Sequence, residues 1–117
     1  MKIQIDTDRT VESTEGLVTM VETEVQSALG RFEDRLTRVE VHLGDENVEK
    51  RKGAADKRCL LEARPTGMQP VVVTGVADTL ERACKDAARK MHDLLSSTFG
   101  RIDDRDAKAT IREEEVP

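Results

Sequence analysis

Aromatic residues are almost absent from this chain of 117 residues, which has no Trp, no Tyr and two Phe. Proteins that hold single-stranded nucleic acids without sequence preference stack the bases on aromatic side chains, so this mode of binding is disfavoured. The core must instead be built mainly from aliphatic residues within the 37% apolar fraction. We therefore expect a small aliphatic core and modest stability.

Long apolar runs are missing as well. No stretch approaches the roughly 20 apolar residues that cross a bilayer, and residues 1–6 lack the apolar region of a secretory signal. The two cysteines, Cys59 and Cys84, fall inside predicted strands and helices, so no disulfide framework is expected. The simplest interpretation is a cytoplasmic protein in a reducing compartment, without a membrane partner.

Residues that carry catalysis or bind metals occur in no recognised pattern. The two His, His42 and His92, and the two Cys lack the C-x-x-C and H-x-x-x-H spacings of zinc sites. Gly75 alone does not form a phosphate-binding loop. Cys59 and Cys84 are expected on buried faces as small apolar residues, and the two His in contact with solvent. We predict no enzymatic activity, no cofactor, no metal and no small-molecule substrate.

The charge of the chain is unevenly distributed. The formal net charge is −5, which by itself disfavours a nucleic-acid partner. Residues 1–34 hold three basic and eight acidic groups and residues 103–117 hold three and six, whereas residues 35–102 hold thirteen and ten. The basic excess therefore lies in the middle of the chain, between two acidic ends.

The stretch that begins at residue 71 predicts a strand followed by a helix. Residues 71–74 are all β-branched, which suits a mostly buried strand, and Gly75 is expected to end it in a turn. Asp78 can accept hydrogen bonds from the first N–H groups of a helix, and Glu81 three residues later completes a capping box.

This helix has two contrasting faces. Apolar residues recur at the 3.6-residue period as far as Phe99, and Gly100 is expected to end the helix. The helix would therefore present an apolar stripe to a sheet and a basic stripe to solvent or to a partner. The basic stripe consists of Arg82, Lys85, Arg89 and His92.

The periodicity of apolar residues predicts the rest of the fold. The expected elements are a strand over residues 2–6, a helix over 14–33, strands over 36–43, 58–64 and 68–75, and a helix from 77 or 78 to 99. This β-α-β-β-β-α order predicts an α+β domain with a four-stranded sheet and two helices packed on one of its faces.

Two segments fall outside these elements. Residues 44–57 are polar and charged and predict a mobile loop between two strands. Residues 101–117 contain too few large apolar residues to build a core, so we expect an acidic, disordered tail after a domain formed by residues 1–100.

Ten basic residues remain as candidates for binding. Clustered on a loop and along a helix, such side chains contact phosphates and give affinity that is independent of base sequence. An α+β domain of this kind suits the recognition of folded RNA by its backbone and shape. The ten are Arg64 and the nine that we predict to contact RNA: Lys50, Arg51, Lys52, Lys57, Arg58, Arg82, Lys85, Arg89 and Lys90.

Acidic residues at helical spacing leave another interpretation open. Residues three or four apart on a helix are neighbours and form ion pairs. Arg82, Lys85 and Lys90 would then support the helix rather than bind a partner. The expected pairs are Glu81 with Lys85, Arg82 with Asp86, Asp86 with Lys90, and Arg89 with Asp93.

Three local patterns, in this order of elements, resemble a known family. Residues 14–17 (Thr-Glu-Gly-Leu) open the first helix, with Phe32 near its end, and residues 37–43 read Thr-Arg-Val-Glu-Val-His-Leu. Over about residues 1–95, the chain resembles the ribosome hibernation-promoting factor and ribosome-associated inhibitor A family. The strongest match is the last strand–helix unit: Val73, Thr74, Gly75, Asp78, Leu80, Ala83, Lys90 and Met91.

This resemblance implies a double-stranded-RNA-binding-like fold that docks on ribosomal RNA in the decoding region of the small ribosomal subunit. Family members occupy the path of messenger and transfer RNA there and silence idle ribosomes under stress, without catalysis. Arg82, Lys85, Arg89 and Lys90 would correspond to the RNA-facing helix. Without the additional C-terminal dimerisation domain of long members, the chain resembles a short form.

The chain also departs from the family pattern. Its second helix leads into an acidic tail rather than a basic end, and the connection between its second and third strands is longer. Together with the net charge of −5, these departures favour an alternative function. In that alternative the chain is a protein-interaction or regulatory module of the same fold that does not bind RNA.

Overall fold

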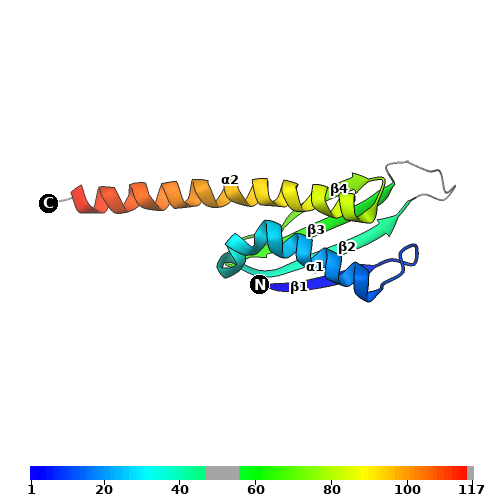
Figure 1. The fold of residues 1–117 in the computed structure, drawn as a ribbon. Coiled ribbons are helices and arrows are strands. Elements are labelled where there is room, and N and C mark those ends of the chain that lie inside the picture. The colour runs from blue at the N-terminus through cyan, green and yellow to red at the C-terminus, as the bar shows by residue number, and fades with distance from the viewer. Residues whose placement is uncertain (47–55, 116–117) are drawn as a thin grey trace.

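The computed structural model describes the backbone of residues 1–46 and 56–115, and the side chains of these ranges up to residue 107. The β-α-β-β-β-α order confirms the predicted α+β class (Figure 1). In chain order the elements are β1 (Lys2–Thr7), α1 (Glu15–Leu29), the 3-10 helix η1 (Gly30–Arg35), β2 (Leu36–Asp45), β3 (Lys57–Pro65), β4 (Val71–Ala77) and α2 (Leu80–Glu115).

The four strands form one mixed sheet in the order β1-β2-β3-β4. β1 runs parallel to β2, and β2, β3 and β4 are successive antiparallel neighbours. Both helices cover one face of the sheet (Figure 1). The alternating residues Val39 and Val41 on β2 and Leu61 on β3 are fully buried beneath them. The other face of the sheet carries no helix. It holds a cluster of polar side chains and, on β4, the exposed Val72 and Val76.

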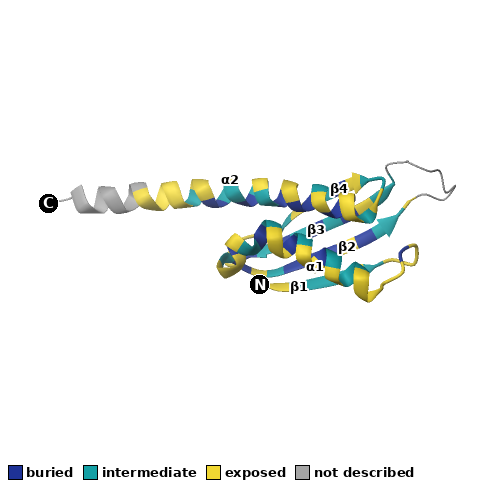
Figure 2. Ribbon diagram, in the orientation of Figure 1, coloured by how far each residue is buried: buried dark blue, intermediate teal, exposed yellow. Residues whose placement is uncertain are grey.

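The core between the sheet and the helices is aliphatic, as expected. α1 contributes Val21 and Val25, and α2 contributes Met91 and Leu95, all at most 1% exposed. The buried side of α2 is continuous along its first half, where it lies over the sheet (Figure 2). The apolar stripe predicted for this helix is therefore the part of α2 that holds it in place.

α1 is shorter than the helix predicted over residues 14–33. Thr14 caps its start, because the Thr14 hydroxyl oxygen accepts a hydrogen bond from the backbone N–H of Leu17 at 3.1 Å. From Gly30 the chain tightens into η1, a 3-10 helix, which places Phe32 in the core.

β4 starts three residues later than predicted because a turn precedes it. The N–H of Met68 donates a hydrogen bond to the carbonyl oxygen of Pro65 at 3.2 Å. Gly67 has a φ of 74°, the left-handed conformation that the third position of a type II turn requires and that glycine adopts without strain.

Gly75 does not form the predicted turn, and that prediction is wrong. β4 continues through Gly75, which lies opposite Cys59 of β3. The missing side chain instead lets α2 approach the sheet. A Cβ at this position would lie 2.3 Å from the carbonyl oxygen of Ala83 and 2.5 Å from the backbone nitrogen of Ala87.

The start of α2 also differs from the prediction, because Thr79 rather than Asp78 caps it. The Thr79 hydroxyl accepts a hydrogen bond from the backbone N–H of Arg82 at 3.1 Å. Asp78 instead uses its carboxylate to bind the guanidinium group of Arg82, at 2.9 and 3.0 Å.

α2 does not end at Gly100, so that prediction is wrong too. The helix is 36 residues long and projects beyond the sheet (Figure 1). Arg35 of η1 makes contacts on both sides of the glycine: its guanidinium lies 4.0 Å from the centroid of the Phe99 ring, and its Nη1 lies 3.0 Å from Asp103 Oδ2. These contacts favour continuation of the helix. The division of the chain at residue 100 remains a prediction.

Within the described ranges, no helix has both the length and the apolar character needed to cross a membrane.

We expect Gly75→Ala to destabilise the protein by about 2 kcal/mol, because the new methyl group must push α2 away from β4. Urea unfolding followed by circular dichroism measures this change. Gly100→Ala is the matched control: it adds the same methyl group where no atom lies within 4 Å and should stabilise α2 by about 0.5–1 kcal/mol. Equal stability of the Gly75→Ala variant and the parent chain would contradict the close approach of α2.

Candidate nucleic-acid interface

The solvent side of α2 carries four of the predicted RNA contacts. The side chains of Arg82, Arg89, Lys85 and Lys90 are 69%, 66%, 56% and 45% exposed, respectively. All four lie outside the buried stripe, with Lys85 on the side of α1 and Lys90 on the side of β4, so packing of that stripe against the sheet fixes their direction. A partner that approaches α2 from solvent can therefore reach all four.

Each of these four basic groups is also paired with a carboxylate. Two of the expected pairs are confirmed, Lys85 with Glu81 at 3.4 Å and Lys90 with Asp86 at 3.0 Å. Lys85 Nζ also lies 3.8 Å from a carboxylate oxygen of Glu24 on α1.

The other two pairs differ from the prediction. Arg82 binds Asp78 at 2.9 Å instead of Asp86, and Arg89 binds Asp86 at 2.9 Å instead of Asp93. A basic residue on a helix has neighbours on both the preceding and the following turn, and spacing alone does not choose between them.

His92, the fourth member of the predicted basic stripe, lies against the core. The centroid of its ring is 5.7 Å from that of Phe32. Its Nδ1 lies 3.3 Å from Asp93 Oδ1, so Asp93 contacts His92 rather than its predicted partner Arg89.

Asp86 and Lys90 have a second role, because they join α2 to the edge strand β4. Lys90 Nζ donates a hydrogen bond to the carbonyl oxygen of Thr74 at 3.0 Å, and the backbone of Val76 donates one to Asp86. Lys90 is therefore committed to the fold more strongly than the other three basic residues of α2.

The pKa of Asp86 is lowered by these contacts. The hydrogen bond from Lys90 is the largest cause, and those from Arg89 and the backbone of Val76 add to it, which together outweigh the opposing effect of burial. The carboxylate is thus stabilised in its ionised form by the folded structure.

Two predicted RNA contacts, Lys57 and Arg58, lie at the end of the sheet where β2 ends and β3 begins, and both are paired with carboxylates. Lys57 lies opposite Asp45 in the register, and its Nζ lies 3.1 Å from Asp45 and 3.2 Å from Asp56. Its side chain is only 23% exposed. The hydrogen bond to Asp45 is the largest cause of its raised pKa.

Arg58 is more accessible, with 48% of its side chain exposed, although its Nη1 lies 3.1 Å from Glu46 Oε1. The remaining predicted contacts, Lys50, Arg51 and Lys52, lie outside the described residues. Within the described part of this end, Arg58 is therefore the more available of the two predicted basic residues.

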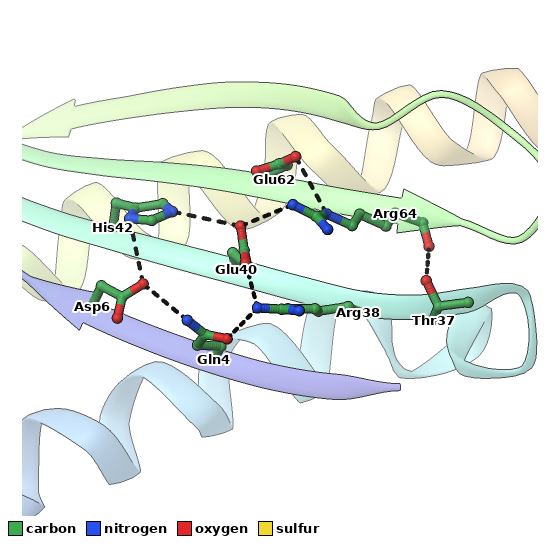
Figure 3. A network of polar contacts seen from close by, with 8 residues as sticks. All are labelled: Gln4, Asp6, Thr37, Arg38, Glu40, His42, Glu62 and Arg64. Carbon is green, nitrogen blue, oxygen red and sulfur yellow. Dashed lines mark hydrogen bonds and ion pairs between the residues drawn. The ribbon is translucent and has the colours of Figure 1, made fainter.

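A second polar cluster, not predicted as a site, occupies the helix-free face of the sheet (Figure 3). We call it the sheet-face network. At its centre is Glu40 of β2, which is 9% exposed. Glu40 lies 2.8 Å from Arg38 Nη2 and 3.5 Å from Arg64 Nη2. The other members are Gln4, Asp6, Thr37, His42 and Glu62.

Glu40 remains ionised despite its burial. Burial raises the pKa of this carboxyl, but a hydrogen bond with Glu62 and the charges of Arg38 and Arg64 outweigh that effect and hold the pKa below its ordinary value. The charges of the sheet-face network are thus largely balanced internally.

Within the described residues, Glu40, His42 and Glu62 are spaced as metal ligands would be, with ligand atoms within 4.8 Å of one another. The oxygens of Glu40 already contact Arg38 and Arg64, however. A bound cation would have to compete with two guanidinium groups, so the cluster fits an ion-pair network better than a metal centre.

The alternation of polar and apolar residues in the sequence predicts that Arg38, Glu40 and His42 share one face of β2. Their partners Glu62 and Arg64 follow from the β2–β3 register, in which Glu40 lies opposite Glu62 and Arg38 opposite Arg64. The buried face of each strand indicates which side chains share a face. It does not indicate which residues of β2 and β3 lie opposite one another, so the contacts of the network could not be predicted.

Comparison with solved structures identifies the fold. The chain matches a ribosomal subunit interface protein from Coxiella burnetii with a TM-score of 0.69 and 14% identity, over 86% of this chain and 99% of that one. It matches the Protein Y N-terminal domain from Thermus thermophilus with a TM-score of 0.66 and 20% identity, over 84% and 99%. No family model and no curated protein matches the sequence.

The lowered pKa of Asp86 leads to a pH-dependent prediction. Its contribution to stability is fully present above its ordinary pKa of 3.8 and is lost as the pH falls through the lowered value. We expect Asp86→Asn to destabilise the protein by about 1 kcal/mol at pH 7, and the difference should shrink at pH values below about 4.

Urea unfolding at a series of pH values measures this difference. Asp93→Asn is the control, because Asp93 is 68% exposed and, within the described residues, forms an ion pair with His92 alone. It should change stability by no more than a few tenths of a kcal/mol. If Asp86→Asn lowers the free energy of unfolding by the same amount at pH 7 and at acidic pH, the charge of the carboxylate does not stabilise the fold.

Proposed function

We propose that this chain is a ribosome-associated translation inhibitor of the hibernation-promoting type. In this proposal it binds ribosomal RNA in the decoding region of the small subunit and blocks the messenger and transfer RNA sites under stress. The observation that carries the proposal is the fold, which matches 99% of the length of a ribosomal subunit interface protein and of the Protein Y N-terminal domain.

The exposed side of α2 supports this proposal. Arg82 and Arg89 are separated by seven residues, or about 10 Å along a helix axis, and both point away from the sheet on a rigid element. Each guanidinium group is itself exposed and pairs with a partly exposed carboxylate about one turn away, Asp78 just before α2 for Arg82 and Asp86 within α2 for Arg89. Pairs near the surface contribute only about 0–1 kcal/mol. An RNA phosphate can therefore replace a carboxylate at small cost, while Lys90 and Lys57 remain bound to the fold.

The mechanism in this proposal is occlusion. A domain held by phosphate contacts occupies space that messenger and transfer RNA need, and no bond is made or broken. Affinity would come from counterion release and would not depend on base sequence. The partner is thus ribosomal RNA of defined shape rather than a defined sequence.

One observation favours a second function. All six predicted RNA contacts that lie in the described ranges have a carboxylate partner, and residues 78–93 hold as many acidic as basic groups. A neutral helix surface suits a protein-interaction or regulatory module of the same fold that does not bind RNA.

Sedimentation separates the two functions. Purified ribosomes and subunits are mixed with the chain at low salt and again at increasing salt. We expect the chain in the small-subunit and monosome fractions at low salt, with a steep loss as salt rises. Absence from both fractions at low salt would contradict the proposal and favour the RNA-independent module.

Charge reversal of Arg82, Lys85 and Arg89 to Glu tests the contact surface, and we expect it to abolish co-sedimentation. Replacing the same residues with Gln should weaken binding and reduce the slope of log affinity against log salt by up to about 3. Lys2→Glu, Arg9→Glu and Arg31→Glu together form the control, since these exposed residues lie outside α2 and give the same change in net charge.

Circular dichroism confirms that each variant is folded. Equal loss of binding in the control would mean that net charge rather than the surface of α2 governs the interaction. Chemical protection of ribosomal RNA in the bound complex tests the location. Protection outside the decoding region alone would contradict occlusion of the messenger and transfer RNA sites but not ribosome association.

A further inference from the structure

Two buried thiols lie in contact across the boundary between the sheet and α2. Cys59 of β3 and Cys84 of α2 are 0% and 1% exposed, and their sulfur atoms are 3.4 Å apart. Both are free thiols. The sequence placed each of them correctly on a buried face, but 25 residues separate them and no spacing rule joins them.

The close approach of α2 to the sheet brings the two sulfurs together. Cys59 lies opposite Gly75 in the β3–β4 register, and the missing side chain of Gly75 admits the backbone of α2 at Ala83 and Ala87. Cys84 follows Ala83 directly. The backbone of the helix therefore passes close to the sheet beside this pair.

We propose that Cys59 and Cys84 are a modification site: on oxidation by a hydroperoxide they form a disulfide that ties α2 covalently to β3. The proposal is independent of ribosome binding. It concerns the position of the helix, whatever partner α2 contacts.

The reaction balances with one hydroperoxide. The Cys84 sulfur attacks the peroxide, so that an S–O bond forms, the O–O bond breaks, and water leaves if the oxidant is hydrogen peroxide. The Cys59 sulfur then attacks the Cys84 sulfur, forming the S–S bond and breaking the S–O bond, and a second water leaves. Two thiols are oxidised and lose two hydrogen atoms, and the peroxide is reduced.

The contact between the sulfurs supports this order of events. The hydrogen bond with Cys84 and the burial of the site raise the pKa of Cys59, whereas the hydrogen bond with Cys59 lowers the pKa of Cys84 against the effect of burial. Cys84 is thus the group that ionises first, and the thiolate is the form that reacts with peroxides.

Burial controls when the reaction occurs. Neither sulfur is open to solvent, so an oxidant reaches the pair only when α2 moves briefly away from the sheet. When α2 returns, the second thiol is already in place. Oxidation should therefore be slow, and it should yield the internal disulfide rather than links between two molecules.

Hydrogen peroxide treatment of the full chain, followed by unfolding in acid and alkylation, tests the proposal by mass spectrometry. We expect two alkyl groups on the reduced chain and none on the oxidised chain, which should have lost two hydrogen atoms, remain monomeric and yield a cross-linked peptide joining β3 to α2. Dithiothreitol should restore both thiols. Persistent alkylation, sulfinic acid at one cysteine or disulfide-linked dimers would overturn the proposal.

Thermal unfolding of the same samples tests the tether. A disulfide that closes a loop of this length should raise the Tm by on the order of 10 °C, and reduction should remove the increase. Cys59→Ala and Cys84→Ala are matched controls, each with one thiol, and peroxide should not raise the Tm of either. A Tm that is unchanged or lower in the oxidised parent chain would contradict tethering of α2.

Discussion

The structure depends on how closely α2 approaches the sheet, and that distance is set by the absence of a side chain at Gly75. No Cβ could be accommodated there without moving the backbone of the helix. The burial of Met91 and Leu95, the hydrogen bonds of Lys90 and Asp86 to β4 and the sulfur contact between Cys59 and Cys84 all depend on this placement. A packed interior does not tolerate such a displacement gradually, because neighbouring side chains interlock.

Electrostatics in this protein is mostly local. The network around Glu40 balances its charges on the helix-free face, and the basic groups of α2 pair with carboxylates one turn away. Exposure divides these pairs into two kinds. The guanidinium groups of Arg82 and Arg89 are exposed to solvent, whereas Lys57 is paired across the two central strands and Lys90 is also hydrogen-bonded to the edge strand β4.

Much of the fold could be predicted because its elements show clear periodicity. The alternation of Val39, Val41 and Leu43 identified β2 and its buried face, and the order of elements gave the fold class. The errors arose where tertiary contacts override local signals. Gly75 and Gly100 look like terminators by residue type, yet packing of α2 on β4 and the contacts of Arg35 carry the strand and the helix through them.

The candidate site was less predictable for a related reason. Helical spacing predicted the pairs of Lys85 and Lys90, but it did not choose the partners of Arg82 and Arg89. Contacts across strands, such as Lys57 with Asp45, require a register that the sequence does not specify. Lys50, Arg51 and Lys52 remain predictions.

The hydrogen bonds from α2 to β4 have a consequence for how the molecule behaves at high concentration. β4 is an edge strand rich in valine, with Val72 and Val76 53% and 47% exposed. Such an edge can serve as a template for a strand of another molecule and start aggregation. Lys90 and Asp86 form hydrogen bonds with the backbone groups of Thr74 and Val76 and bring charge to this edge, so the residues that anchor α2 also oppose the addition of a strand from another molecule.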